Sequence, residues 1–154
     1  MHYCSTLIAV RDMARSLEFY RTVLGLTVER DFGANKTLTG GIVLQTAETW
    51  KDFIAGRPVA YGGNAGELYF EEDAFDDFAE RLGGLDVDYV HPVLEHPWGQ
   101  RVVRFFDPDR NIIEVGENLA AVCRRFLDSG MTVCETAARM DVPEDYVRAC
   151  QAQK

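Results

Sequence analysis

The stretch from Thr6 to Leu26, TLIAVRDMARSLEFYRTVLGL, predicts a strand followed directly by a helix. Residues 6–10 are β-branched or apolar, which is typical of a strand. Asp12 is a suitable helix N-cap, and apolar residues then recur from Met13 at i, i+4, i+7 and i+11, the spacing of an amphipathic helix. Gly25 provides the helix stop. Strands are expected next at residues 26–30, 36–39 and 42–45, which completes a βαβββ module.

The same pattern recurs after a shift of 62 residues, which places Ser5 on Glu67 and Met13 on Phe75. Strands are expected at residues 68–70, 87–90, 102–106 and 112–115, with a helix over 75–82. The sequence therefore predicts an α+β fold in which two βαβββ modules, at about residues 1–48 and 64–118, form one domain, 1–118. The two sheets should pair into an open curved sheet whose inner face lines a pocket.

Residues 119–154 follow the second module and predict a helical tail. One helix covers 119–127, a capping box from Thr132 to Glu135 opens a second, and a third begins at 142–145. The last two resemble a small helix-turn-helix unit. The final helix begins with two acidic residues and carries a single arginine, so packing within the protein or a dimer is favoured over DNA binding.

Composition restricts the classes of partner. The 154 residues carry a net charge of -9, which disfavours nucleic acid. No apolar run reaches the length of a membrane span, and the first residues do not form a signal peptide, so we expect a cytoplasmic protein without membrane contact. The four cysteines form no Cys-x-x-Cys pair and are expected to be reduced thiols.

Two segments carry a family resemblance: Val10–Leu26, and Pro97–Arg101 followed by Phe106–Val115. They resemble the vicinal oxygen chelate superfamily, which includes glyoxalase I, the bleomycin-resistance proteins and the extradiol dioxygenases. The likeness covers about residues 5 to 117. It implies the paired-module fold and a homodimer, and it leaves open whether the chain is an enzyme.

In metal-dependent members of this superfamily, four strand positions hold one divalent ion. The positions that correspond here are Ser5, Val43, Glu67 and Glu114. Only the two glutamates are plausible ligands, whereas catalytic transition-metal sites normally need three protein donors. A divalent metal is therefore a possible cofactor with an incomplete ligand set, which either histidine of a proline-containing loop, His91 or His96, could help to complete.

Glu67 and Glu114 are also the candidate catalytic residues. Without a metal, two facing carboxylates repel each other, which raises the pKa of at least one and makes it a candidate proton donor or acceptor. The alternative is that both are solvated carboxylates at strand ends.

A second group of candidates would bind the ligand. Aromatic side chains stack on flat organic molecules, and acidic groups complement a cation. The residues expected to contact a small organic ligand are Trp50, Tyr61, Tyr69, His96, Trp98 and Arg104. Aromatic residues on strands are more often core, and the linker from Trp50 to Gly63 is either a flap or a packed junction.

Three functions are compatible with this sequence. The first is a glyoxalase/bleomycin-resistance-like protein that binds an aromatic or cationic molecule without a complete metal site. The second is a metal-dependent lyase or isomerase similar to lactoylglutathione lyase (glyoxalase I), or a related dioxygenase. A ligand-responsive regulator is the weakest of the three.

Overall fold

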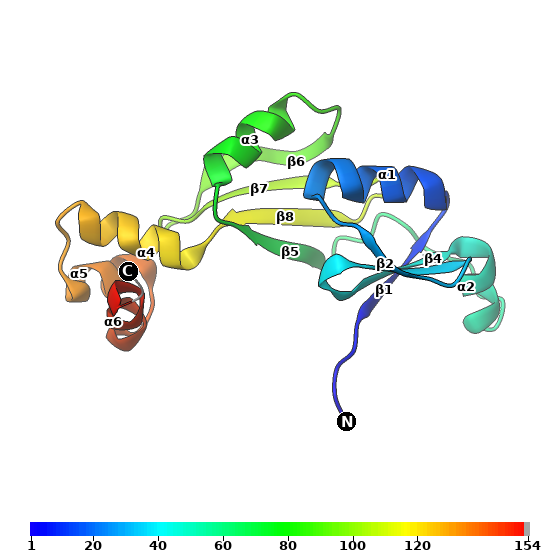
Figure 1. The fold of residues 1–154 in the computed structure, drawn as a ribbon, viewed down its shortest axis with the longest axis horizontal. Helices are drawn as coiled ribbons and strands as arrows, with labels where there is room; N and C mark the ends of the chain where they lie inside the picture. Colours follow the sequence, from blue (N-terminus) through cyan, green and yellow to red (C-terminus); the bar gives the residue numbers. More distant parts are fainter. Residues whose placement is uncertain (153–154) are drawn as a thin grey trace. The chain divides into compact units, whose positions relative to one another are not determined.

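The computed structural model of the protein describes residues 1–152 and divides into two compact units. Unit 1 comprises Met1–Gly66 and Phe106–Asn111; unit 2 comprises Glu67–Phe105 and the chain from Ile112 onward. Each unit contains a four-stranded mixed sheet with helices (Figure 1). The expected α+β class with two βαβββ modules is confirmed.

Unit 1 has the sheet order β1-β4-β3-β2, in which β1 and β4 are parallel and the other pairs are antiparallel. The buried side chains of this unit include Val10, Leu38 and Leu44. Its elements are β1 (Thr6–Val10), α1 (Met13–Leu24), β2 (Val28–Asp31), β3 (Asn35–Leu38), the short 3-10 turn η1 (Thr39–Gly41), β4 (Ile42–Thr46) and α2 (Ala47–Phe53).

The ends of α1 follow the sequence signals. The Asp12 side chain accepts a hydrogen bond from the Arg15 N–H at 3.0 Å, which satisfies one of the free N–H groups of the first turn. Gly25 ends the helix with φ of 70°, a left-handed conformation that glycine adopts without steric cost. The helix therefore begins and ends where the sequence predicts.

Unit 2 repeats this arrangement with the sheet order β5-β8-β7-β6. Tyr69 of β5 pairs with Glu114 of β8 in a parallel register, and in unit 1 the register pairs Leu7 with Val43. Leu7 and Tyr69 are 62 residues apart, the shift seen in the sequence, whereas Val43 and Glu114 are 71 residues apart, so the second module is longer between its first and last strands. The elements are β5 (Glu67–Glu72), α3 (Phe75–Gly83), β6 (Asp88–Glu95), β7 (Arg101–Phe106) and β8 (Ile112–Glu117).

Two sequence expectations about local structure were wrong. His91 was placed in a loop, but β6 extends through His91 and Pro92 to Glu95. Since β6 is an edge strand, proline is tolerated there. Trp50 was placed in an irregular linker, but it lies within α2, which begins directly after β4.

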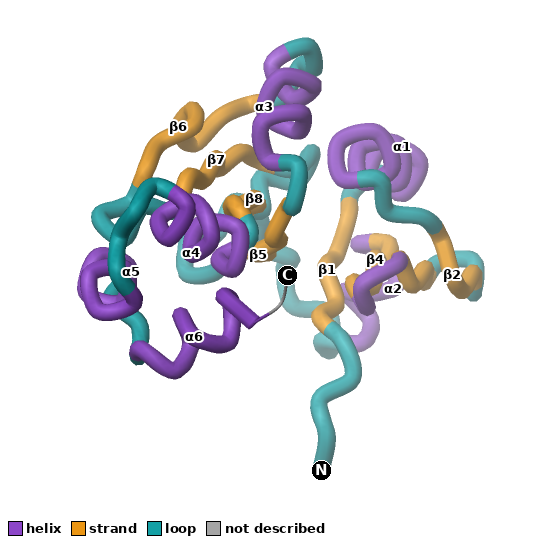
Figure 2. The backbone as a smooth tube through the Cα atoms, turned by 60° about the vertical axis from the view of Figure 1, so that its left-hand side comes forward, coloured by secondary structure: helices purple, strands orange, loops and turns teal. Residues whose placement is uncertain are grey.

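The tail consists of α4 (Leu119–Asp128), α5 (Val133–Met140) and α6 (Glu144–Ala152), which pack against one another (Figure 2). Its apolar cluster is fully or nearly fully buried and consists of Val122, Cys123, Ala137, Met140, Val147 and Cys150. The predicted capping box between Thr132 and Glu135 is present at the start of α5. Across residues 1–152, no helix is both long enough and apolar enough to cross a membrane.

A buried hydrogen bond fixes the turn Phe106–Asn111 within unit 1. The Tyr20 hydroxyl donates to the Asp107 carboxylate at 3.0 Å, and both side chains are buried. Asp107 also accepts hydrogen bonds from the backbone N–H groups of Asp109 and Asn111. Burial, together with the adjacent Asp107 charge, raises the pKa of Tyr20, so its hydroxyl stays protonated and remains a donor.

We expect Tyr20→Phe to destabilise the protein by about 1–2 kcal/mol, because it removes one hydrogen bond to a buried carboxylate while keeping the ring. Urea unfolding would measure the change. Tyr3→Phe removes a hydroxyl from a side chain that is 79% exposed and serves as the control. Equal stability of both variants would show that the bond contributes nothing.

Candidate functional site

Four side chains on the sheet of unit 2, one from each strand, form a polar row: Glu67, Glu114, Arg104 and His91. The Arg104 guanidinium is at its centre. Its Nε and Nη2 donate to the Glu67 carboxylate at 2.8 and 3.4 Å, and Nη2 also forms an ion pair with Glu114. Nη1 lies 3.2 Å from His91 Nε2. One cation therefore bridges both candidate catalytic carboxylates.

The polar row exists because side chains alternate along the strands. Val103 and Phe105, on either side of Arg104 in β7, are completely buried, as is Ile113 beside Glu114 in β8. The apolar residues form the core, and Arg104 and Glu114 point to the opposite face. Glu114 is only 5% exposed, so it depends on a cationic partner, whereas Glu67 is more accessible.

The two contacts of His91 are compatible with one neutral tautomer. His91 Nδ1 lies 2.8 Å from the Pro92 carbonyl oxygen, which can only accept a hydrogen bond. With the proton on Nδ1, Nε2 is free to accept from Arg104. With His91 neutral, the four side chains together carry a net charge of -1.

Next to the polar row lies a second group, the aromatic edge, made of Tyr69, His96, Trp98 and Gln100. The His96 and Trp98 rings are stacked with centroids 4.2 Å apart. Trp98 Nε1 donates to Gln100 Oε1 at 3.1 Å, and Gln100 Nε2 donates to the Tyr69 hydroxyl at 2.9 Å. Tyr69 and Trp98 remain 47% and 36% exposed, so their rings are available to a ligand.

Electrostatics join the two groups. Burial, and then the positive charge of Arg104, lower the pKa of His96, while the Glu67 carboxylate acts in the opposite direction. His96 is therefore neutral at pH 7. The predicted residues Glu67, Tyr69, His96, Trp98, Arg104 and Glu114 thus all belong to one neighbourhood of unit 2.

The other two ligand-binding candidates belong to unit 1. Trp50 is half-buried on α2, where its ring makes an edge contact with Phe53. The Tyr61 ring lies under the Arg11 guanidinium, 3.7 Å from its centre. Both aromatic rings therefore have local packing partners in unit 1.

The four positions that would hold a divalent ion in metal-dependent relatives do not form a ligand set here. Ser5 is exposed before β1, and Val43 is buried in β4, so neither supplies a ligand atom of the kind the resemblance requires. Glu67 and Glu114 share the Arg104 guanidinium, and the Arg104 side chain also contacts His91 Nε2. Within residues 1–152, no group of three or more His, Cys, Asp or Glu side chains is arranged to hold a metal. The donor set does not fit a divalent ion while Arg104 is in place.

Sequence reasoning missed two residues of this region. Gln100 connects Tyr69 with Trp98, and Glu117 accepts hydrogen bonds from Arg101 and Arg125. Gln100 lies two residues after Trp98 in the segment that carries the family resemblance, which was a usable signal. Glu117 gave none, because its role depends on an arginine of the tail.

Comparisons with known proteins agree with this fold. A family model described as "Glyoxalase-like domain" matches residues 3–120. The uncharacterized protein YraH of Bacillus subtilis (strain 168) is 26% identical over 117 residues, which cover 70% of this chain and 91% of that protein. The match ends near the start of α4, so the family model does not account for the tail.

Solved structures show the same similarity. A protein of unknown function from Agrobacterium tumefaciens str. C58 is 34% identical with a TM-score of 0.70, covering 77% of this chain and 94% of that one. A glyoxalase/bleomycin resistance protein/dioxygenase from Nocardioides has the same fold, with a TM-score of 0.60 at 21% identity, over 76% of this chain and 83% of that one.

Removal of the Arg104 guanidinium should lower the free energy of unfolding. We expect Arg104→Met to destabilise the protein by about 3 kcal/mol, because it leaves the buried Glu114 carboxylate without a counter-charge. Adding Glu114→Gln should restore part of the loss, as urea unfolding of the single and double variants would show. Arg30→Met, on exposed β2, is the control. A cost for Arg104→Met no larger than for the control would contradict this role.

The stacked pair gives a pH-dependent signal. In a Trp50→Phe background Trp98 is the only tryptophan, and protonation of His96 should quench its emission. Because the pKa of His96 is lowered, we expect the quenching midpoint below 6.5, the ordinary pKa of histidine. His96→Gln should abolish the transition. A midpoint above 6.5, or a transition that persists in His96→Gln, would refute the assignment.

Proposed function

The chain belongs to the glyoxalase-like domain family, and we propose that it binds a small cationic aromatic molecule at the polar row and aromatic edge of unit 2, without a bound metal. The main support for the proposal is that Arg104 forms ion pairs with both carboxylates that a metal would otherwise bridge, while partly exposed aromatic rings lie beside them.

Charge favours a cation. The polar row carries two carboxylates against one guanidinium, and with neutral imidazoles a single negative charge remains uncompensated. Glu67 is the more accessible carboxylate, so the excess charge is available to a ligand on that side. An anionic ligand would have to displace a carboxylate from Arg104, which leaves a buried charge unpaired.

The aromatic edge supplies the second part of the recognition. Tyr69 and Trp98 offer partly exposed faces, and an organic cation over such a ring gains roughly 0.5–2 kcal/mol. The Trp98 indole N–H and the Tyr69 hydroxyl are both engaged by Gln100, which limits their rotation before a ligand arrives. Pre-ordered side chains lose less entropy on binding.

The same contacts favour binding over proton transfer. Both Glu67 and Glu114 are ion-paired with Arg104, so the guanidinium occupies carboxylate oxygens that a substrate proton would need. A general base needs an oxygen within hydrogen-bond reach of the proton that it abstracts. The site therefore supports sequestration of a ligand better than isomerisation or lyase chemistry.

Isothermal titration with benzyltrimethylammonium tests the proposal, with benzyl alcohol and benzoate as neutral and anionic analogues. We expect the cation to bind most tightly, and Glu67→Gln to weaken it by about tenfold, or about 1.4 kcal/mol. Glu80→Gln, which removes the same charge from an exposed position on α3, is the matched control.

Three results would overturn the proposal: preferential binding of benzoate, no binding of the cation, or one tightly held divalent ion per chain in protein purified without chelator. The last of these would direct attention to lyase and dioxygenase assays.

A further inference from the structure

The segment His96–Gln100, here called the tryptophan loop, connects β6 with β7 and carries three of the four residues of the aromatic edge. Its backbone closes on itself, because the His96 N–H donates to the Gln100 carbonyl and the Gly99 N–H donates to the His96 carbonyl, both at 2.8 Å. Gly99 has φ of 86°, a conformation that favours glycine. Trp98 and Gln100 therefore move together with Gly99.

Phe126 of α4 lies directly against this loop. A methyl group at position 99 would be 2.3 Å from Phe126 Cζ, a distance at which no side chain fits. The backbone conformation at position 99 thus favours glycine, and any larger residue there would have to displace the Phe126 ring. Close packing of this kind transmits displacement, because protein interiors have few voids.

Arg125, adjacent to Phe126, fixes the same loop through polar contacts. Its Nη2 donates to the Gly99 carbonyl at 2.8 Å and to Glu117 Oε2 at 3.0 Å. Burial raises the pKa of Glu117, but the hydrogen bonds from Arg101 and Arg125 outweigh it, so the net shift is downward and the carboxylate stays charged. Gln100 Nε2 donates to the Glu117 carbonyl at 2.8 Å.

The start of the loop has a further contact from the tail. Arg139 of α5 donates to Glu95, the last residue of β6, at 3.2 Å, and its guanidinium also lies near the Phe126 ring. The three tail helices share one apolar cluster, so Phe126 and Arg139 are held by a packed unit. The loop is therefore contacted by α4 and the residue before it by α5, and both contacts come from residues beyond 120, where the match to the family model ends.

We propose that the C-terminal tail is part of the ligand site, with Phe126 and Arg125 as positioning residues that hold the tryptophan loop so that Trp98 and Gln100 present the aromatic edge. This inference rests on the proposed function for its effect on affinity. The effect on the loop is independent of any ligand. Phe126 is the main contact, because Arg125 is 40% exposed and surface ion pairs contribute little.

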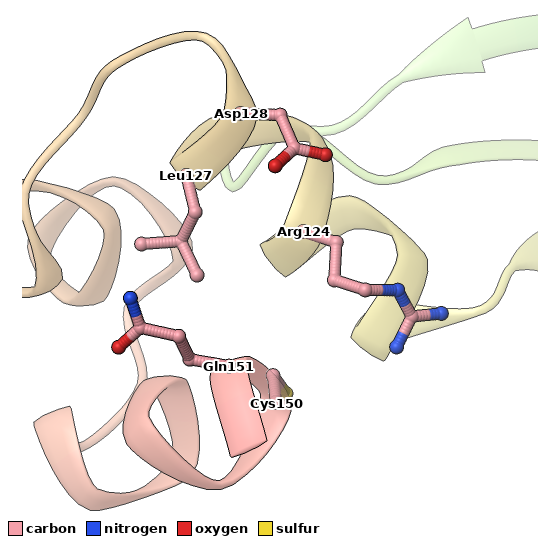
Figure 3. Close-up of a pocket in the computed structure, with 5 residues that line it drawn as sticks. All are labelled: Arg124, Leu127, Asp128, Cys150 and Gln151. Carbon is pink, nitrogen blue, oxygen red and sulfur yellow. The ribbon is translucent and has the colours of Figure 1, made fainter. Parts of the chain in front are cut away.

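A neighbouring residue provides a matched control. Leu127 follows Phe126 on α4 but lines a cavity of about 240 Å³ between α4 and α6, together with Arg124, Asp128, Cys150 and Gln151 (Figure 3). Leu127→Ala therefore weakens the packing of the same helix without touching the loop. An effect seen in Phe126→Ala but not in Leu127→Ala is therefore caused by loss of the contact between Phe126 and the tryptophan loop.

The experiment uses the full chain in a Trp50→Phe background and compares Phe126→Ala, Phe126→Leu and Leu127→Ala. Acrylamide quenching of Trp98 emission reports loop mobility, circular dichroism reports folding, and titration with benzyltrimethylammonium reports affinity. We expect Phe126→Ala to increase quenching and weaken binding by about tenfold, the cost of ordering two freed side chains. Phe126→Leu should restore both values in part, and Leu127→Ala should change only thermal stability.

The outcomes separate the two proposals. If the parent protein does not bind the cation but Phe126→Ala still increases Trp98 quenching, the proposed function fails and the positioning role stands. If folded Phe126→Ala leaves Trp98 quenching unchanged, or if Leu127→Ala changes it equally, the positioning role is wrong.

Discussion

The Arg104 guanidinium is the interaction on which the site of unit 2 depends. It contacts side chains from the three other strands of its sheet, and two of them are carboxylates. Without it, Glu114 would be an unpaired charge at 5% exposure, a state that costs several kcal/mol. An arginine differs from a metal ion here, because its planar donors point in fixed directions and leave no coordination position for a substrate oxygen.

A second buried carboxylate, Glu117, organises the other end of the same sheet. Its carboxylate accepts hydrogen bonds from Arg101 of β7 and Arg125 of α4, and its backbone carbonyl oxygen accepts one from Gln100 Nε2. Both ends of unit 2 therefore use a carboxylate of β8 with an arginine of β7. At the Arg104 end the partners are all strand residues, whereas at the Glu117 end the third partner comes from the tail. The tail is thus tied to the sheet by charge as well as by apolar packing.

Much of the fold was predictable because its signals are local. The N-cap at Asp12, the glycine stop at Gly25 and the capping box at Thr132 each depend on a few consecutive residues, and all three are present. Glu67 and Glu114 were identified through the resemblance. The bridging position of Arg104 could not be read from the sequence, because it depends on the register of β7 against β8 and on rotamers. For the same reason, the expected repulsion between the two glutamates ignored the cation between them.

The error about His91 shows how one local signal can mislead about a site. Proline next to His91 suggested a loop, but an edge strand tolerates proline, and the strand places His91 against Arg104. A loop histidine would be a mobile candidate ligand for a metal. In the strand, His91 Nδ1 donates to the Pro92 carbonyl, which leaves Nε2 free to accept a hydrogen bond from the Arg104 guanidinium. The three neighbours of Arg104 are thus all acceptors, which explains why a permanent cation is stable at the centre of the site.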